Sequence, residues 1–181
     1  MATLKVQEDS SISHCTYHVF LSFRGKDTCK TFTDHLYTAL VQAGFRTFKD
    51  EEDIESGESI KLELHKAIPL SRISVIVYSK NFASSKCCLD ELLTILECKR
   101  TSKHVVVPVF YDVDPTEVKN QTGSFAEAFM RHEQMEAEND ERKNEWMEKV
   151  KKWRAALREV ADLGGRVFQN QADGQFFSKF L

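Results

Sequence analysis

Short apolar runs alternate with amphipathic segments along most of the chain. Four runs are rich in β-branched and aromatic residues and end at polar or turn residues, a pattern typical of buried strands. The runs predicted as strands are residues 17–23, 45–48, 73–78 and 105–111. Apolar residues at helical spacing predict helices over residues 32–43, 60–68, 89–96 and 146–160, with a charged, less regular helical region over 124–139. A short fifth strand is predicted around residues 166–169.

Glycine, proline and serine residues mark several of the predicted element ends. Gly44 follows the first helix at the position typical of a helix C-terminus, and the second helix must end near Pro69. Ser84 and Ser85 are cap candidates for the third helix. Pro108 lies inside the fourth strand and cannot donate to a ladder. We therefore expect that strand near a sheet edge, or with a bulge.

The alternation of strands with helices predicts an α/β domain. Continuous apolar strands are typical of a parallel sheet covered by helices on both faces. We expect a five-stranded, doubly wound sheet of order 2-1-3-4-5, in which ligands bind beyond the carboxyl ends of strands 1 and 3. Arg24, Gly25 and Lys26 follow the first strand and Ser79 follows the third, so these residues are expected to bind a substrate.

Length, composition and charge exclude several classes of function. The chain has 181 residues, of which 41% are hydrophobic, enough for one domain with its own core. Its formal net charge of -3 supplies no basic face for a phosphate backbone, so nucleic acid is not an expected partner. Residues 1–13 are polar and no later run has the length of a membrane span. We expect a protein of the cytoplasm, with the nucleus as a second location, and no membrane association.

The cysteines and histidines lack the spacing of a metal site. Five cysteines include one adjacent pair and no C-x-x-C, and six histidines are scattered along the chain. We therefore expect no bound metal and a reducing compartment. Cys87 and Cys88 are interpreted as core or helix-start residues rather than nucleophiles, because no histidine lies in an evident pairing context.

Several motifs resemble those of a known family. The run from Tyr17 to Thr28, YHVFLSFRGKDT, resembles the opening motif of plant TIR domains, those of TIR-NB-LRR disease-resistance receptors. Further matches follow in the family's order at residues 31–36 (TFTDHL), 44–45 (GF), 84–92 (SSKCCLDEL) and 107–115 (VPVFYDVDP). The resemblance implies a flavodoxin-like fold, homotypic assembly and, for many members, NAD⁺ hydrolysis by a helix glutamate, which is Glu91 in this chain.

Glu91 is accordingly the candidate catalytic residue. By pattern alone, Asp90 and Glu91 could be exposed carboxylates that favour the helix dipole. A carboxylate also suits cleavage of the nicotinamide–ribose bond, because that reaction builds oxocarbenium character. Arg24 would hold the pyrophosphate beside the backbone N–H groups at Gly25. Because the chain has no G-x-G-x-x-G fingerprint, we expect NAD⁺ or NADP⁺ as a transient substrate and no tightly bound cofactor.

Residues 50–57 form an acidic stretch between the second strand and the second helix. By composition this stretch is a solvated loop, in which Gly57 supplies backbone freedom. The resemblance implies that the loop gates the substrate pocket and contacts a neighbouring protomer. Its expected functional residues are Asp50, Asp53, Ile54 and Gly57.

The resemblance also implies self-association. Asp34 and His35 are expected on the exposed side of the first helix, where the family often has a Ser-His pair. Lys152 and Gly164 are expected to contribute at the last helix. Since a signalling module must switch, its interfaces should be small, and association should depend on concentration.

Three positions depart from the family pattern. Cys87 stands where tryptophan commonly precedes C-L-D-E-L, and Asp34 replaces the serine of the Ser-His pair. Arg166 follows two glycines where a Gly-Trp pair is frequent. The first departure bears on activity and the other two bear on assembly.

Two functions from different classes fit this interpretation. The first is an assembly-dependent NAD⁺ glycohydrolase that triggers defence and cell death, with activity limited in a monomer because an exposed Glu91 would be screened by water. The second is a non-catalytic adaptor that recruits other TIR domains. A phosphoacceptor receiver domain shares the alternation but requires an aspartate at the end of the third strand, where Tyr78 and Ser79 stand.

The expected domain covers residues 15–168. A flexible tail is expected over residues 1–14, and residues 169–181 would start a linker toward a nucleotide-binding domain. The resemblance implies that such a chain works with the nucleotide-binding and leucine-rich-repeat domains of a larger receptor.

Overall fold

The computed structural model describes residues 15–28, 32–49, 58–135 and 140–168. Its described part contains one five-stranded sheet in which every neighbouring pair of strands is parallel. The strands are β1 (Tyr17–Ser22), β2 (Thr47–Lys49), β3 (Ser71–Tyr78), β4 (Val105–Tyr111) and β5 (Arg166–Phe168). Their order, β2-β1-β3-β4-β5, confirms the predicted topology and puts the switch point between β1 and β3.

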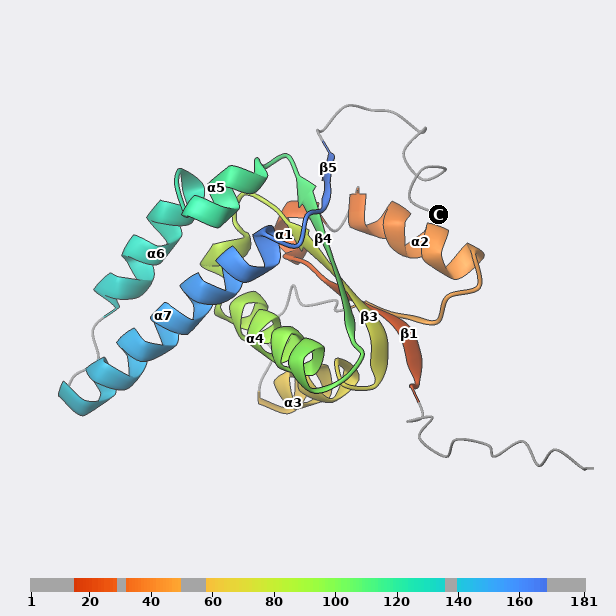
Figure 1. The fold of residues 1–181 in the computed structure, drawn as a ribbon, viewed down its shortest axis with the longest axis horizontal. Coiled ribbons are helices and arrows are strands. Elements are labelled where there is room, and N and C mark those ends of the chain that lie inside the picture. The colour runs from red at the N-terminus through yellow and green to blue at the C-terminus, as the bar shows by residue number, and fades with distance from the viewer. Residues whose placement is uncertain (1–14, 29–31, 50–57, 136–139, 169–181) are drawn as a thin grey trace, which may run out of the picture.

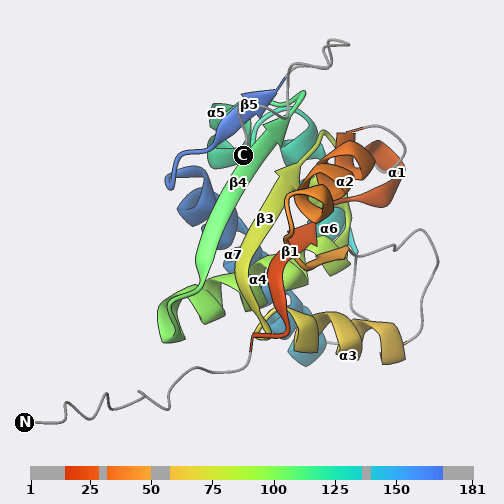
Figure 2. The ribbon, with the colours of Figure 1, turned by 90° about the vertical axis from the view of Figure 1, so that its right-hand side faces the viewer.

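Helices cover both faces of the sheet, which confirms the three-layer α/β fold (Figure 1). The helices are α1 (Gly25–Thr28), α2 (Asp34–Gln42), α3 (Glu58–Ala67), the 3-10 helix η2 (Phe82–Ser84), α4 (Lys86–Thr101), α5 (Pro115–Asn120), α6 (Ser124–Gln134) and α7 (Asp140–Ala161). Figure 2 shows α2 on one side of the strands, with α4 and α7 on the other. No helix in the described residues is both long and apolar enough to cross a membrane.

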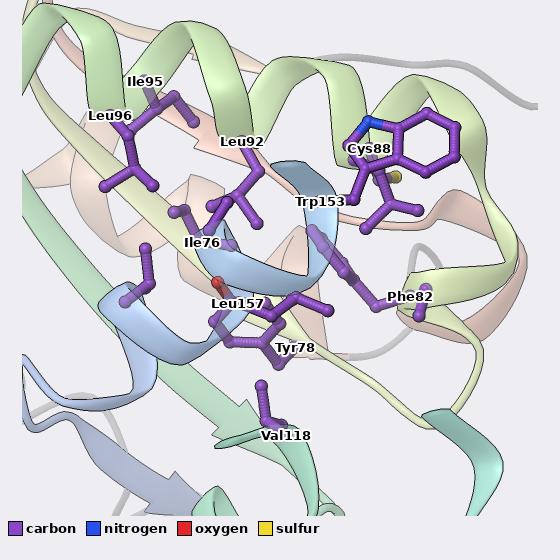
Figure 3. Close-up of a cluster of buried hydrophobic side chains, with 14 of the residues drawn as sticks. Ile76, Tyr78, Phe82, Cys88, Leu92, Ile95, Leu96, Val118, Trp153 and Leu157 are labelled. Carbon is purple, nitrogen blue, oxygen red and sulfur yellow. The ribbon is translucent and has the colours of Figure 1, made fainter. Parts of the chain in front are cut away.

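The larger core lies between the sheet and helices α3 to α7. Figure 3 shows Leu92 of α4 and Trp153 and Leu157 of α7 gathered near Ile76 and Tyr78 of β3. All five side chains are fully buried. Burying a side chain of this size stabilises the folded state by about 1.5–3 kcal/mol relative to leaving it exposed. This packing fixes α4 on the sheet, and α4 carries Glu91.

The smaller core lies on the opposite face, under α2. Leu36 and Leu40 of α2 pack with side chains of β1, β3 and β4, including Val19 and Leu21. Phe20, which lies between Val19 and Leu21 in the strand, packs into the larger core instead. Alternate residues of β1 therefore face opposite cores, which is why the strand reads as a continuous apolar run.

Two predicted helix ends are confirmed by their hydrogen bonds. Gly44 has a φ of 88°, and the N–H groups of Gly44 and Phe45 each donate to a carbonyl of the last turn of α2 at 3.0 Å. This pair of bonds is the Schellman arrangement, in which glycine adopts the left-handed conformation without strain. At the start of α4, the Ser85 hydroxyl accepts a hydrogen bond from the Cys88 N–H at 3.3 Å.

Pro108 is accommodated one strand in from the edge of the sheet. β4 pairs with β3 along its length, whereas its pairing with the edge strand β5 begins only at Val109. Pro108 thus lies outside the β4–β5 ladder, as its missing N–H requires. The backbone at Gly165 also passes very close to Pro108, because a Cβ built on Gly165 would lie 2.3 Å from the Pro108 carbonyl oxygen. Only glycine fits there without a shift of the backbone.

Several elements differ from the prediction, and the short helices α1 and η2 were not predicted. The second strand begins at Thr47 and not at Phe45, because Phe45 belongs to the turn that closes α2. Helix α5 was not predicted, since Pro115 was taken only as part of a motif. Asp114 caps this helix by accepting a hydrogen bond from the Thr116 N–H at 2.8 Å, and proline is favoured at the first helical position.

Candidate functional site

The candidate site lies at the carboxyl ends of β1 and β3. Ser22 is the last residue of β1 and Tyr78 the last of β3. The chain continues from β1 into α1, and from β3 into η2 and α4. These connections bring together Arg24, Ser79 and Glu91, which the sequence had placed at the switch point of the sheet.

Glu91 is buried and held by a strand residue. Its side chain is 2% exposed, and the Ser22 hydroxyl donates a hydrogen bond to Glu91 Oε2 at 2.7 Å. The expectation of an exposed carboxylate is therefore wrong for this structure. The reason is helical geometry: Glu91 follows the buried Cys88 by three residues and precedes the buried Ile95 by four, so it shares their face of α4.

Cys87 lies one helical turn before Glu91. Its thiol is 3.7 Å from Glu91 Oε1, a distance typical of a weak S–H···O hydrogen bond. The thiol of Cys88 is directed to the Phe23 carbonyl oxygen at 3.6 Å. Both cysteines lie in the first turn of α4, as predicted, and Cys87 also contacts the candidate catalytic carboxylate.

The neighbouring acid, Asp90, has a different environment. The Trp153 indole N–H donates to Asp90 Oδ1 at 3.0 Å, and Lys149 Nζ donates to Oδ2 at 3.1 Å. Both partners lie on α7, so Asp90 joins α4 to α7 on the side away from β1. The structure thereby distinguishes two carboxylates that the sequence pattern treats alike.

The loops after β1 and β3 are joined by four hydrogen bonds. Asp27 accepts from the Ser79 hydroxyl at 2.7 Å, the Asn81 N–H at 3.0 Å and the Asn81 side-chain amide at 3.1 Å. Arg24 Nη1 donates to the Asn81 carbonyl oxygen at 2.6 Å. We call this set of residues, Arg24, Asp27, Ser79 and Asn81, the loop clasp. It fixes the direction of Arg24 relative to β3.

The clasp changes the interpretation of the predicted substrate-binding residues. Ser79 is buried and its hydroxyl proton is used by Asp27, so Ser79 acts as a brace between the loops. Gly25 begins α1 half-buried, and Lys26 is exposed on that helix. Sequence reasoning missed Asp27 and Asn81, although short polar side chains in loops commonly bond to nearby backbone.

The predicted gating residues Asp50, Asp53, Ile54 and Gly57 fall outside the described residues. Among the residues that the structure describes, no three His, Cys, Asp or Glu side chains group closely enough to hold a metal ion.

The predicted self-association residues lie on opposite faces of the sheet (Figure 1). His35 is exposed on α2, whereas Asp34 is half-buried and forms an ion pair with Lys49 of β2. The Asp34 side chain thus stays partly exposed, while Lys49 at the end of β2 reaches the first turn of α2 to pair with it. On the other face, Gly164 is exposed after α7.

Lys152 lines an open groove on the surface of α7. The groove has a volume of about 570 Å³ and is lined by Leu93, Asn144, Glu145, Glu148, Lys149 and Lys152. Both acidic and basic side chains line this groove. It does not include Glu91 or Arg24, so it is separate from the candidate site.

Comparison with known proteins agrees with the fold and with the sequence motifs. The family model described as "TIR domain" matches residues 16–180. The chain is 51% identical over 150 residues to the disease resistance protein RPV1 of Vitis rotundifolia, and 48% identical over 156 residues to the TMV resistance protein N of Nicotiana glutinosa. These matches cover 83% and 86% of this chain but only 10% and 13% of the two relatives.

A solved structure gives the same result in three dimensions. The chain matches the TIR domains in the structure of the activated Roq1 resistosome, which directly recognises the pathogen effector XopQ, with a TM-score of 0.74 and 46% sequence identity. The match covers 91% of this chain and 94% of that one. Since the motifs, the strand order, the family model and this structural match all agree, the chain belongs to the TIR domain family of plant disease-resistance proteins.

Proposed function

We propose that this domain cleaves NAD⁺ between nicotinamide and ribose, and that it does so as the signalling part of a plant immune receptor. The observation that carries the proposal is the place of Glu91. A carboxylate that is buried at the switch point of a doubly wound sheet, beside a cationic loop, is where such folds bind nucleotides. Burying a carboxylate is costly, so a stable domain without a use for Glu91 would favour an apolar residue there.

In the proposed reaction, Glu91 faces the ribose of the nicotinamide riboside. Departure of nicotinamide leaves positive charge on the ribose ring, and a carboxylate with little water around it stabilises that charge. Water then adds to the ribose carbon and gives ADP-ribose-type products. Glu91 contributes by its charge and position, which is consistent with its burial and with its bond to Ser22.

Arg24 is the proposed holder of the substrate's pyrophosphate. One of its N–H groups is used by the Asn81 carbonyl, while a guanidinium has five N–H donors. Within the described residues Arg24 forms no ion pair, so its charge is available for a phosphate. Arg24 follows Ser22 by two residues, and Ser22 contacts Glu91 directly, so the two proposed functional groups are tied to one strand end.

The burial of Glu91 supports an activity that depends on assembly. With its side chain 2% exposed, the carboxylate is covered in the single domain, and substrate can reach it only after a local rearrangement. Homotypic contact with a second domain is the proposed cause of that rearrangement. The TIR domains of the Roq1 resistosome belong to an assembled receptor, which favours the same principle for this chain.

The domain is further proposed to act within a longer receptor in the cytoplasm. The two plant relatives are about eight to ten times longer than their match to this chain. Nucleotide-binding and leucine-rich-repeat domains are the proposed partners in the same polypeptide. They would bring several TIR domains together when a pathogen is recognised.

Nicotinamide release from NAD⁺ by the purified domain tests the proposal. Glu91→Gln should abolish release, whereas Asp90→Asn, which also removes one negative charge from α4, should retain it because Asp90 faces α7. A wild-type domain that released no nicotinamide at any protein concentration would favour the adaptor alternative. Wild-type release by Glu91→Gln would refute the catalytic assignment.

A further inference from the structure

Ser22 is a buried polar residue at the end of β1, next to apolar residues. Its side chain is 0% exposed, and it lies between Leu21 and Phe23, which are also buried. Because alternate strand residues share a face, Ser22 points to the same side as Phe20, toward the core under α4. An alanine or valine would fit this apolar pattern, so the hydroxyl needs an explanation.

The contact of the Ser22 hydroxyl with Glu91 supplies that explanation. Ser22 Oγ donates to Glu91 Oε2 at 2.7 Å, a normal length for an O–H donor to a carboxylate. The bond joins residues 69 positions apart, one on a central strand and one on α4. Hydrogen bonds with an ionised partner are about twice as strong as those between neutral groups, and a buried carboxylate depends on them.

We infer that Ser22 is the positioning residue of Glu91, and this inference rests on the proposed function. The strand end holds Oε2 of the carboxylate in a fixed direction, while Cys87 contacts Oε1 at the longer distance of 3.7 Å from Glu91's own helix. Of these two contacts, the one to Ser22 ties Glu91 to the sheet. It also ties Glu91 to the chain segment that carries Arg24.

This arrangement predicts how Ser22 affects the reaction. Rate enhancement by a positioned group falls steeply when that group is displaced by an ångström or less. Without the Ser22 bond, the Glu91 carboxylate loses the contact that holds Oε2 to the strand end, and fewer molecules hold it in the reactive direction. Ser22 itself does not touch the substrate. Its loss should therefore lower kcat and leave KM nearly unchanged.

The matched control is Ser74. It is also 0% exposed, lies on the neighbouring strand β3, and its hydroxyl bonds to a side chain, His104 Nε2, at 2.7 Å. In the sheet Ser74 is opposite Phe20, two residues before Ser22, so it lies away from the strand ends. Ser74→Ala removes an equivalent buried hydroxyl bond without touching Glu91.

The first test is the kinetics of nicotinamide release by the folded variants. Ser22→Ala should lower kcat by about tenfold to a hundredfold, the effect of losing one hydrogen bond to a charged group. Its KM should stay within about twofold of wild type, as expected when only transition-state interactions are lost. Ser74→Ala should keep the wild-type kcat, and circular dichroism checks that both variants are natively folded.

The second test does not need activity. With carbon-13 labelling, the side-chain carboxyl signal of Glu91 is identified in NMR spectra by its absence from Glu91→Gln. Ser22→Ala should move this signal and Ser74→Ala should not. This measurement reports directly on the bond between Ser22 and the carboxylate.

The outcomes separate the inference from the proposed function. If Glu91→Gln is inactive but Ser22→Ala keeps the wild-type kcat, only the positioning role of Ser22 is overturned. An unmoved Glu91 signal in Ser22→Ala would overturn it as well. If Glu91→Gln keeps its activity, or the wild-type domain has none, the proposed function and the positioning role fall together.

Discussion

At the residue scale, partners rather than residue type decide what each carboxylate can do. Asp90 and Glu91 are consecutive acids on α4 with separate environments. Asp90 accepts hydrogen bonds from Lys149 and Trp153 of α7 and stays partly exposed. Glu91 is buried against the end of β1. Asp90 therefore joins α4 to α7, and Glu91 is the carboxylate to which we assign the proposed chemistry.

His132 of α6 is another buried titratable residue. Its ring packs against Trp153, with centroids 5.3 Å apart, and its Nε2 bonds the Ala83 carbonyl oxygen of η2 at 2.7 Å. Nε2 must donate in this bond, and Nδ1 has no hydrogen-bond partner among the described residues. Burial lowers the pKa of His132, and nearby Lys86 lowers that pKa further, although the bond to Ala83 acts in the opposite direction.

We predict that the domain loses stability as the pH falls below about 6.5, the ordinary pKa of histidine. Below that pH the unfolded state binds protons at His132 while the folded state does not, so acid favours unfolding. The loss continues until the pH reaches the lowered pKa of the folded state. His104, whose pKa is also lowered by burial, acts in the same direction. Denaturant unfolding between neutral pH and mild acid measures the effect.

The matched variant is His132→Gln, which keeps an N–H donor for the Ala83 carbonyl but does not titrate. Its free energy of unfolding should depend less steeply on pH in this range than that of the wild type. An equal slope in the variant and the wild type would exclude His132 as a source of the pH dependence. A wild-type stability that rose toward acid pH would contradict the lowered pKa.

Part of the site could be predicted from single residues, and part could not. Glu91 and Arg24 lie in recognisable motifs, and parallel strand ends meet at one edge, so their proximity followed from the topology. Ser22 was missed because its role depends on a contact with a residue 69 positions away. Such a contact is set by how α4 packs on the sheet, and no local pattern encodes it. The burial of Glu91 is different, because its helical spacing with Cys88 and Ile95 already puts it on the apolar face of α4.

At the scale of elements, the loop clasp is the feature that shapes the site. It joins α1 to the loop between β3 and η2 through Asp27, which accepts three hydrogen bonds. Both loops leave the sheet at the switch point, where no strand pairing continues to hold them. The clasp therefore replaces the sheet as the support of Arg24.

We predict that Asp27→Ala frees the loop after β3 without unfolding the domain. Amide hydrogen exchange at residues 79–82 should become about tenfold faster or more, since each lost hydrogen bond is worth about 1 kcal/mol. Asp34→Ala is the control, because it also removes a half-buried aspartate and breaks its ion pair with Lys49. Exchange at residues 79–82 should be unchanged in that control. Wild-type exchange in Asp27→Ala would show that the loop is held by other contacts.

Element prediction succeeded where local signals and packing agree. The strand over 105–111 has its predicted limits, and α4 starts at its predicted cap, because an apolar run and a serine cap are local features. Helix α5 was missed because Pro115 was considered only as part of a motif and not together with Asp114. Only with Asp114 as the cap does the same proline start a helix. Phe45 was assigned to a strand because its apolar character masked its role in the turn after Gly44.

At the scale of the whole molecule, the predicted self-association residues belong to separate surfaces. α2 and α7 pack on opposite faces of the sheet, so His35 and Lys152 cannot belong to one surface patch of a single domain. Two surfaces per domain would allow domains to assemble beyond a pair. The ion pair of Asp34 with Lys49 makes Asp34 a poor probe of assembly, since its loss also changes the domain itself.

His35 is the cleaner probe of the α2 surface. We predict that His35→Ala weakens self-association, raising the dissociation constant by about tenfold, a typical effect for one contributing interface residue. Glu97→Ala, an exposed change on α4, should leave it unaltered. Sedimentation velocity over a range of protein concentrations measures both. Equal association by His35→Ala and the wild type would remove α2 from the assembly interface.

Glu91 is proposed to cleave NAD⁺ once domains assemble. The most direct measurement is the rate of nicotinamide release per domain, for the wild type and Glu91→Gln, at protein concentrations below and above the onset of self-association. We expect that the wild-type rate per domain rises with assembly, and that Glu91→Gln assembles equally but is slower by about a hundredfold or more. A Glu91→Gln variant that releases nicotinamide at the wild-type rate would contradict it.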